Sequence, residues 1–165
     1  MKNTSQNTHI TPKIPPGIDV KGISDSIIEH EFIRRFTLSA GERIGCADDL
    51  VLHLRPFFTD PFREQFAVVF LNGRNAVIKT EVLFEGTLTT SAVYPREVVR
   101  KVIEYGAAAV LFAHNHPSGN PNPSQDDIII TKKLEEACDT IDVTVHDHII
   151  IAGTEYTSFS DKGLI

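Results

Sequence analysis

The chain has 165 residues, of which 41% are hydrophobic and 23% are charged, and these proportions indicate one globular domain with a single core. The formal net charge is -6 and no block of Lys and Arg is present, so the balance argues mildly against a nucleic-acid binder, which usually carries a basic stripe. The sequence contains neither an apolar run of about 18 residues nor an apolar signal region. We therefore expect a cytoplasmic protein without a membrane segment.

The first third of the chain is the hardest part to interpret. Residues 1–20 are rich in Thr, Asn, Lys and Pro, a composition that predicts a flexible leader. Residues 21–59 are expected to form an N-terminal extension that packs on the domain, with a short helix after Cys46 that ends at Pro56. Cys46 and Cys138 are far apart in a chain without an export signal, so both are expected to be buried free thiols.

Residues 60–165 carry the strong signals for regular structure. Apolar runs, turn residues and helix caps predict the following elements in chain order: a strand from Phe66 to Leu71, a turn over Asn72–Asn75, a strand from Ala76 to about Phe84, a helix from Pro95 to about Gly106, a strand from Ala107 to Ala113, a helix from Ser124 to about Thr140, and a closing strand from Val143 to Ala152. This order favours one α/β-type domain in which a sheet is flanked by helices.

Two histidines, His114 and His116, follow the strand predicted over 107–113. Side chains at i and i+2 of an extended segment share one face, so both imidazoles can reach one ion. A loop rich in Pro and Gly turns the chain back, and Asp127 then falls in the first turn of the helix that Ser124 begins. Two imidazoles and one carboxylate leave a fourth tetrahedral position for water, as in catalytic zinc sites. The sequence therefore predicts one zinc ion that activates a water for hydrolysis.

Structural interpretations of the same residues remain open. Ser124 and Asp127 have the spacing of a capping pair, although Asp127 can cap the helix and bind a metal at once. A second H-x-H, formed by His146 and His148 around Asp147, lies on a predicted strand. Neither a third ligand nor a turn into a helix follows it. We expect these histidines to have a structural role, or to hydrogen-bond to the metal ligands without contacting the metal, rather than to form a second metal site.

The segment HNHPSGNPNPSQDD, residues 114–127, resembles the JAMM motif of the JAB/MPN metalloprotease superfamily and, more closely, its RadC branch. The resemblance covers about residues 60–165, and it is to short RadC-like proteins, not to longer members with a helix-hairpin-helix region in front. It implies an α+β fold, a single JAB/MPN domain with a cytidine-deaminase-like mixed β-sheet flanked by helices. Further blocks carry the likeness: Glu64-x-Phe66, Phe84–Leu88, Pro95–Glu97 and Asp147–Ile150.

The resemblance also implies a glutamate upstream of the motif that faces the metal-activated water. The candidates are Glu64, Glu81 and Glu85, and we favour Glu64 because it precedes a buried strand and lies 50 positions before His114. Glu64 would accept the proton of the water and deliver it to the leaving amine. Ser124, like its JAMM counterpart, would donate to the developing oxyanion.

The leading hypothesis is thus a JAMM-type zinc metalloprotease that cleaves a peptide or isopeptide bond in a protein or peptide substrate. A metal-dependent nuclease or DNA-repair-associated factor is the first alternative, but the acidic charge balance does not support a nucleic-acid partner. A non-enzymatic scaffold is the second alternative. All four positions of the motif are filled, which speaks against a scaffold.

Overall fold

The computed structural model describes residues 37–86 and 93–165, so the leader predicted over 1–20 lies outside the described residues. The helices are α2 (Ala47–Leu54), α3 (Pro95–Tyr105) and α4 (Gln125–Asp139), with a short 3-10 turn η1 (Arg55–Phe57) after α2. The strands are β1 (Gln65–Leu71), β2 (Val77–Glu85), β3 (Ala109–Asn115), β4 (Thr144–Ala152) and β5 (Glu155–Ser158).

Within the described residues the strands form one mixed sheet in the order β2-β1-β3-β4-β5. β1 runs antiparallel to β2 and β3, β3 runs parallel to β4, and β4 runs antiparallel to β5. A parallel pair needs a crossover connection, and α4 provides it between β3 and β4. The arrangement confirms the mixed sheet flanked by helices and the single α+β domain that the sequence predicts.

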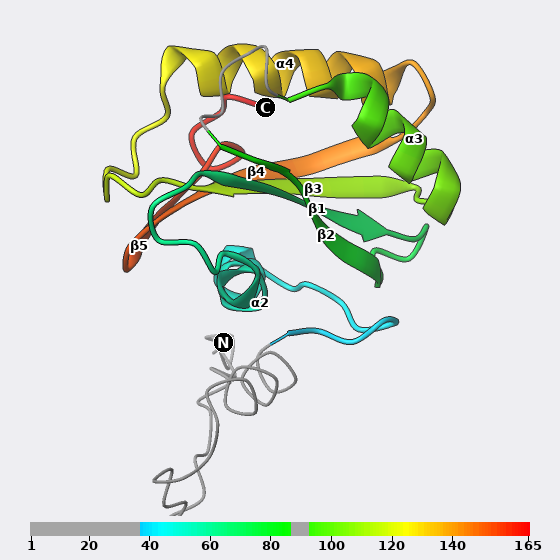
Figure 1. Ribbon diagram of the computed structural model, residues 1–165. Coiled ribbons are helices and arrows are strands. Elements are labelled where there is room, and N and C mark those ends of the chain that lie inside the picture. The colour runs from blue at the N-terminus through cyan, green and yellow to red at the C-terminus, as the bar shows by residue number, and fades with distance from the viewer. Residues whose placement is uncertain (1–36, 87–92) are drawn as a thin grey trace, which may run out of the picture.

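The sheet is covered on both faces, by α3 and α4 on one side and by α2 on the other (Figure 1). β1 and β3 are buried along their whole length as a result. Successive side chains of a strand point to opposite faces. Alternate residues of β1 therefore join different cores. Phe66, Val68 and Phe70 lie beneath α3 and α4, whereas Ala67, Val69 and Leu71 lie beneath α2.

The helix boundaries follow from local capping chemistry. Pro95 occupies the first turn of α3, where its missing N–H costs no helical hydrogen bond. Gly106 ends this helix with φ 61°, a left-handed conformation that favours glycine. Both features agree with the sequence prediction.

Two sequence predictions are wrong. β4 does not close the sheet, because the chain turns at Gly153 and adds β5 as the edge strand. A four-residue strand carries too little periodicity to stand out in the sequence. Cys46 is exposed rather than buried, because it lies at the N-cap of α2, whereas Cys138 is buried as expected.

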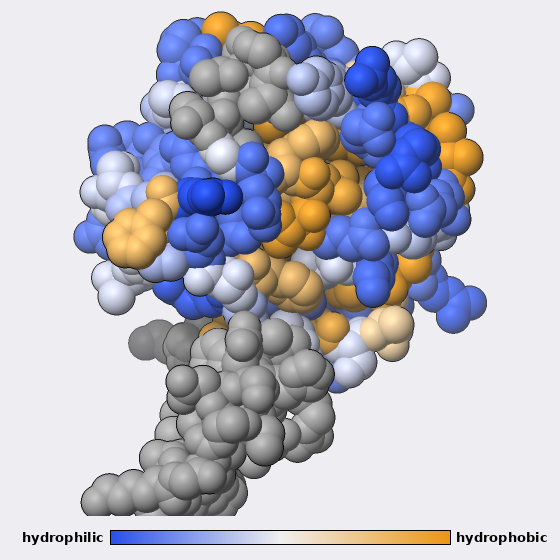
Figure 2. Space-filling view, viewed as in Figure 1, coloured by the Kyte–Doolittle hydropathy of each residue, from blue (hydrophilic) through white to orange (hydrophobic). Residues whose placement is uncertain are grey.

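The opposite edge of the sheet, β2, carries both apolar and charged residues. Residues 82–84 are only partly buried, and Figure 2 shows apolar surface gathered over the middle of this face with hydrophilic surface on both sides. Lys79, Glu81 and Glu85 are distributed along the same strand. Charged side chains on an edge strand disfavour pairing with other chains.

Among the described residues, no helix is both long enough and apolar enough to cross a membrane.

Helix α2 is attached to the sheet through a buried histidine. His53 is 1% exposed, and its Nδ1 accepts a hydrogen bond of 2.8 Å from the backbone N–H of Leu38. Its ring hydrogen must therefore lie on Nε2, which is 2.7 Å from Thr80 Oγ1 on β2. Burial lowers the pKa of His53 to about 4, and the charge of Glu42 offsets this only in part.

His53 should make the stability of the protein depend on pH. Unfolded histidine titrates at about pH 6.5, so the unfolded chain binds the proton before the folded chain does. The contribution of neutral His53 is complete above that pH and is lost as the pH falls towards about 4, by about 3 kcal/mol in total. Urea unfolding of the wild type and of His53→Gln across this range measures the loss, because glutamine can make both hydrogen bonds without titrating. Parallel loss of stability in the two proteins would contradict the assignment to His53.

Candidate metal centre

His114 is the polar end of an apolar row on β3. Val110 and Phe112 precede it at alternate positions on the face covered by α3 and α4. His116 follows the strand, and its backbone N–H donates to Ile151 O at 2.8 Å, which continues the pairing of β3 with β4. The strand pairing thus carries both imidazoles to the place where α4 begins.

Asp127 reaches the same place from the first turn of α4. Ser124 is the N-cap, and its Oγ accepts from the Asp127 backbone N–H at 3.1 Å. Asp127 Oδ2 accepts in return from the Ser124 backbone N–H at 2.7 Å and from the Ser124 hydroxyl at 2.6 Å. The predicted capping pair is confirmed. Because the hydroxyl hydrogen of Ser124 is engaged with Asp127, a donation to an oxyanion requires this hydroxyl to rotate.

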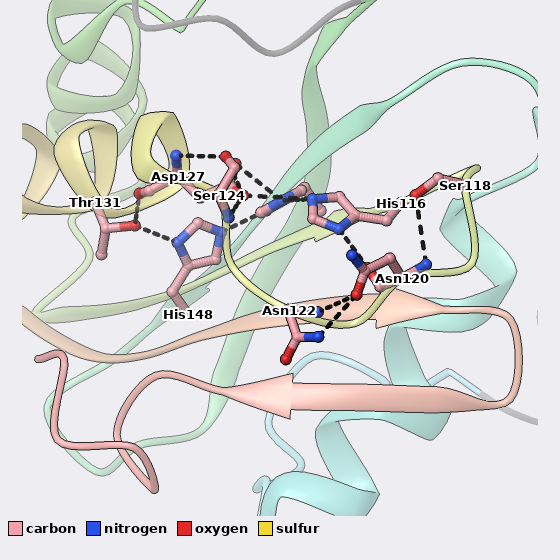
Figure 3. A network of polar contacts seen from close by, with 9 residues as sticks. His116, Ser118, Asn120, Asn122, Ser124, Asp127, Thr131 and His148 are labelled. Carbon is pink, nitrogen blue, oxygen red and sulfur yellow. Dashed lines mark hydrogen bonds and ion pairs between the residues drawn. The ribbon is translucent and has the colours of Figure 1, made fainter.

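The three predicted ligands converge at one point, and two of them, His116 and Asp127, are labelled in Figure 3. His114 Nε2 and His116 Nε2 are 2.9 Å apart, and they lie 3.3 Å from Asp127 Oδ1 and 3.4 Å from Asp127 Oδ2, respectively. Ligand atoms about 2.0–2.1 Å from a tetrahedral ion lie about 3.3 Å from one another. The two imidazoles and one carboxylate therefore have the chemistry of a metal site, and their ligand atoms lie close enough together to share one ion, although the two imidazole nitrogens are nearer to each other than a bound tetrahedral ion would hold them.

The loop after His116 determines which of its ring nitrogens faces the cluster. His116 Nδ1 lies 2.7 Å from the carbonyl oxygen of Asn120, and a carbonyl can only accept. Nδ1 therefore carries the hydrogen, and a neutral His116 directs the lone pair of Nε2 towards His114 and Asp127. Gly119 turns this loop with φ 75°, which favours glycine.

The electrostatics of the cluster favour an ionised Asp127 and a neutral His114. Burial by itself would raise the pKa of Asp127, but contacts with His114, His116 and Ser124 hold it well below its usual range. Burial lowers the pKa of His114, which is 1% exposed, whereas the contact with Asp127 raises that of the more exposed His116. A charged carboxylate beside neutral imidazole is the donor state that metal binding requires.

Glu64 lies just before β1, on the side of the strand that faces the cluster. The antiparallel register pairs Phe66 with His114, and continuing it by two residues places Glu64 opposite His116. Burial is the largest effect on the pKa of His114 and lowers it, and the contact with Asp127 is the largest effect on the pKa of His116 and raises it. The negative charge of Glu64 adds a smaller upward effect on each of the two pKa values. The backbone thus brings the favoured glutamate to the ligands, and its role as the base stays a prediction.

The other two glutamates are engaged elsewhere. Glu81 forms an ion pair of 3.1 Å with Lys101 of α3. Glu85 Oε1 accepts a hydrogen bond of 2.9 Å from Gln65 Nε2. These contacts leave Glu64 as the candidate whose charge acts on the ligand histidines.

Asn115 forms hydrogen bonds with the backbone on both sides of Glu64. The sequence alone did not predict this role. Its Oδ1 accepts from the Gln65 backbone N–H at 2.6 Å, and its Nδ2 donates to Arg63 O at 3.0 Å. Gly86 N–H donates to the carbonyl of Glu64 itself at 2.9 Å. The residue between the two ligand histidines therefore places the backbone of Glu64. A surface cavity of about 410 Å³ opens beside it, lined by Phe62, Arg63, Glu64, Gly86, Pro117 and Ser118.

Among the described residues, neither histidine of the second H-x-H belongs to a group of side chains that could hold a metal ion. His146 is exposed and lies 3.0 Å from Asn75 Oδ1. His148 is fully buried, which lowers its pKa well below the ordinary value, and its Nε2 is 2.8 Å from His114 Nδ1. One histidine of this pair thus touches a ligand from behind, and the other lies at the surface.

Fold and ligand cluster together define a JAB-type domain with a candidate metal site. A model of the family described as the RadC-like JAB domain matches residues 44–164. The chain therefore belongs to this family, as the motif resemblance predicted. The match takes in α2, which the sequence prediction assigns to the extension over 21–59, and the boundary at residue 60 stays a prediction.

Relatives with measured identities support the same family. The chain is 44% identical over 129 residues to a UPF0758 protein of Vibrio vulnificus, an alignment that covers 78% of this chain and 58% of that protein. It is 49% identical over 113 residues to a UPF0758 protein of Aliivibrio salmonicida, with coverages of 68% and 50%. The chain thus spans between 50% and 58% of the length of these relatives.

The two H-x-H pairs provide a matched test of metal binding. Wild-type protein exposed to zinc and then desalted should retain about one ion per chain, as a three-ligand site requires. His116→Ala removes a ligand and should retain well below one ion, whereas His146→Ala should behave like the wild type. Elemental analysis of the three proteins measures the ratio. Equal zinc content in His116→Ala and the wild type would contradict this ligand set.

Proposed function

We propose that this protein is a JAMM-type zinc hydrolase that cleaves a peptide or isopeptide bond in a protein or peptide substrate. The convergence of two imidazole nitrogens and one carboxylate, with Glu64 opposite His116, is the observation that carries the proposal. Zinc is the proposed ion because this donor set and its spacing are typical of catalytic zinc sites. When bound, zinc lowers the pKa of a coordinated water from about 15.7 to about 7.

Other residues of the chain would carry out proton transfer, positioning and oxyanion stabilisation. Glu64 would take a proton from a water at the candidate metal cluster and deliver it to the leaving amine, and its position opposite His116 supports this role. Asn115 keeps the backbone of Glu64 in place on both sides. Ser124 is the proposed donor to the developing oxyanion, once its hydroxyl turns away from Asp127. The cavity beside Glu64 offers room for a segment of the substrate.

A metal-dependent nuclease is the alternative that the test must address. The net charge of -6 does not favour a polyanionic substrate. Peptide, isopeptide and DNA substrates should therefore be assayed side by side, with a chelator added to a parallel set. Cleavage of DNA alone would replace the proposed function by the nuclease.

Glu64→Ala separates catalysis from metal binding. The variant should keep the zinc content of the wild type, because Glu64 is not among the ligands, and should lose about 10²- to 10⁴-fold in turnover. Glu85→Ala is the matched control, since Glu85 contacts Gln65 rather than the ligand histidines, and it should retain activity. Full turnover by Glu64→Ala would show that another group is the base.

A further inference from the structure

A chain of buried hydrogen bonds links two of the ligands behind the metal-facing side of the cluster (Figure 3). Thr131 Oγ1 donates to the backbone carbonyl of Asp127 at 2.6 Å. The same hydroxyl lies 2.6 Å from His148 Nδ1, and His148 Nε2 lies 2.8 Å from His114 Nδ1. Thr131, His148 and His114 are each 1% exposed or less. We call these groups the buried chain.

The direction of the buried chain is determined at its Asp127 end. A backbone carbonyl can only accept, so the single hydroxyl hydrogen of Thr131 points to Asp127 O. Thr131 Oγ1 then has only lone pairs to offer to His148. His148 Nδ1 must therefore carry a hydrogen and donate it to Thr131.

The same reasoning extends to the ligand. Full burial disfavours a second proton on His148, so its Nε2 bears a lone pair and accepts from His114 Nδ1. A neutral His114 that carries its hydrogen on Nδ1 has a free lone pair on Nε2, the atom that faces His116 and Asp127. We propose that Thr131 and His148 are positioning residues that hold His114 in its metal-binding tautomer. The proposal rests on the metal site of the proposed function, but not on its reaction.

Aromatic rings keep the His148 ring from turning. Phe159 stacks on it with a centroid distance of 4.8 Å and an interplanar angle of 29°. Phe66 and Phe112 meet it edge-on at 5.5 and 6.0 Å. In a packed core such contacts restrict side chains to one rotamer, so the acceptor nitrogen of His148 stays directed at His114.

The two imidazole ligands are therefore held in different ways. His116 donates to the carbonyl of Asn120, which belongs to an exposed loop. His114 donates into the core, through groups of β4 and α4 that are almost inaccessible to water. His114 is thus the preorganised ligand of the pair.

Thr131→Val tests the direction of the buried chain, because it replaces the hydroxyl by a methyl group of similar size. His148 then loses its acceptor at Nδ1. Buried N–H groups without a partner are rarer in proteins than buried acceptors without one, so we expect His148 to shift its hydrogen to Nε2, where His114 can accept it. His114 must then accept at Nδ1 and carry its own hydrogen on Nε2, where it blocks the metal.

The first measurement is the tautomer of His114 in the full-length, metal-free protein, read from ring ¹⁵N shifts above the ordinary histidine pKa. The wild type should show the Nδ1–H form, and Thr131→Val a mixture or the Nε2–H form. The second is zinc affinity, from competition with a chromophoric chelator. Thr131→Val should bind zinc about 10- to 100-fold more weakly, as is usual when a group that orients a ligand is removed.

Two variants control for effects unrelated to direction. Thr131→Ser keeps the hydroxyl and should restore both readouts. Thr140→Val removes a hydrogen bond of the same i to i−4 kind from α4, since Thr140 Oγ1 donates to Glu136 O, but far from His148 along the helix. It should leave both readouts unchanged. If Thr131→Val does not fold, His148→Gln serves instead: its amide can present either oxygen or N–H to His114, so a mixture of tautomers is expected.

The proposal is wrong if Thr131→Val retains the Nδ1–H form of His114 and binds zinc as tightly as Thr140→Val. Neither readout needs a substrate. Normal zinc binding and tautomer shifts without hydrolysis of any substrate would overturn the proposed function and leave the positioning role intact. If the wild type hydrolyses a substrate but its His114 carries the hydrogen on Nε2, the positioning role is overturned and the proposed function stands.

Discussion

Helices cover both faces of the sheet, so the central strands β1 and β3 have no side that faces water. A polar side chain in such a strand is tolerated only when other groups satisfy it. His114 meets this condition at the end of β3, where Val110 and Phe112 precede it on the same face and α4 begins beside it. The burial that demands a partner for His114 also lowers its pKa and keeps the imidazole available as a ligand. The outer side of the cluster, at His116, remains more open.

At the start of α4, Asp127 both caps the helix and belongs to the candidate metal cluster. Asp127 accepts from the N-cap residue Ser124, and its charge lies at the positive end of the helix, where a carboxylate is stabilised. Although burial alone would raise its pKa, contacts with His114 and His116, together with the hydrogen bond from Ser124, hold the pKa of Asp127 low, so that it stays ionised while only 3% exposed. The helix cap and the candidate metal ligand are thus the same group, and the hydrogen bonds of the cap determine the position of the carboxylate. The capping residues would retain this geometry in a protein without metal.

The two H-x-H pairs, on the neighbouring strands β3 and β4, are arranged differently. His114 and His116 direct their Nε2 atoms to one point. In β4 the register passes from Val145, opposite Val110, to Asp147, opposite Leu111, so that His146 is left over as a bulge. The bulge breaks the alternation of faces, and His146 becomes exposed while His148 enters the core. Spacing along the sequence is therefore an incomplete guide to which side chains share a face.

The sequence by itself determined what depends on short-range chemistry. The strand before His114, the turn rich in Pro and Gly, and the cap that includes Asp127 are local signals, and all of them occur in the structure at the predicted places. Tertiary structure alone decided what depends on register between distant segments. Three glutamates were candidates by position, and only the pairing of β1 with β3 brings Glu64 opposite a ligand. The contact of His148 with His114 likewise follows from the parallel pairing of β3 with β4 and from the bulge within it. Register is a collective property of whole strands, because every residue of both strands must find its layer at once, and a single sequence carries no local mark of it.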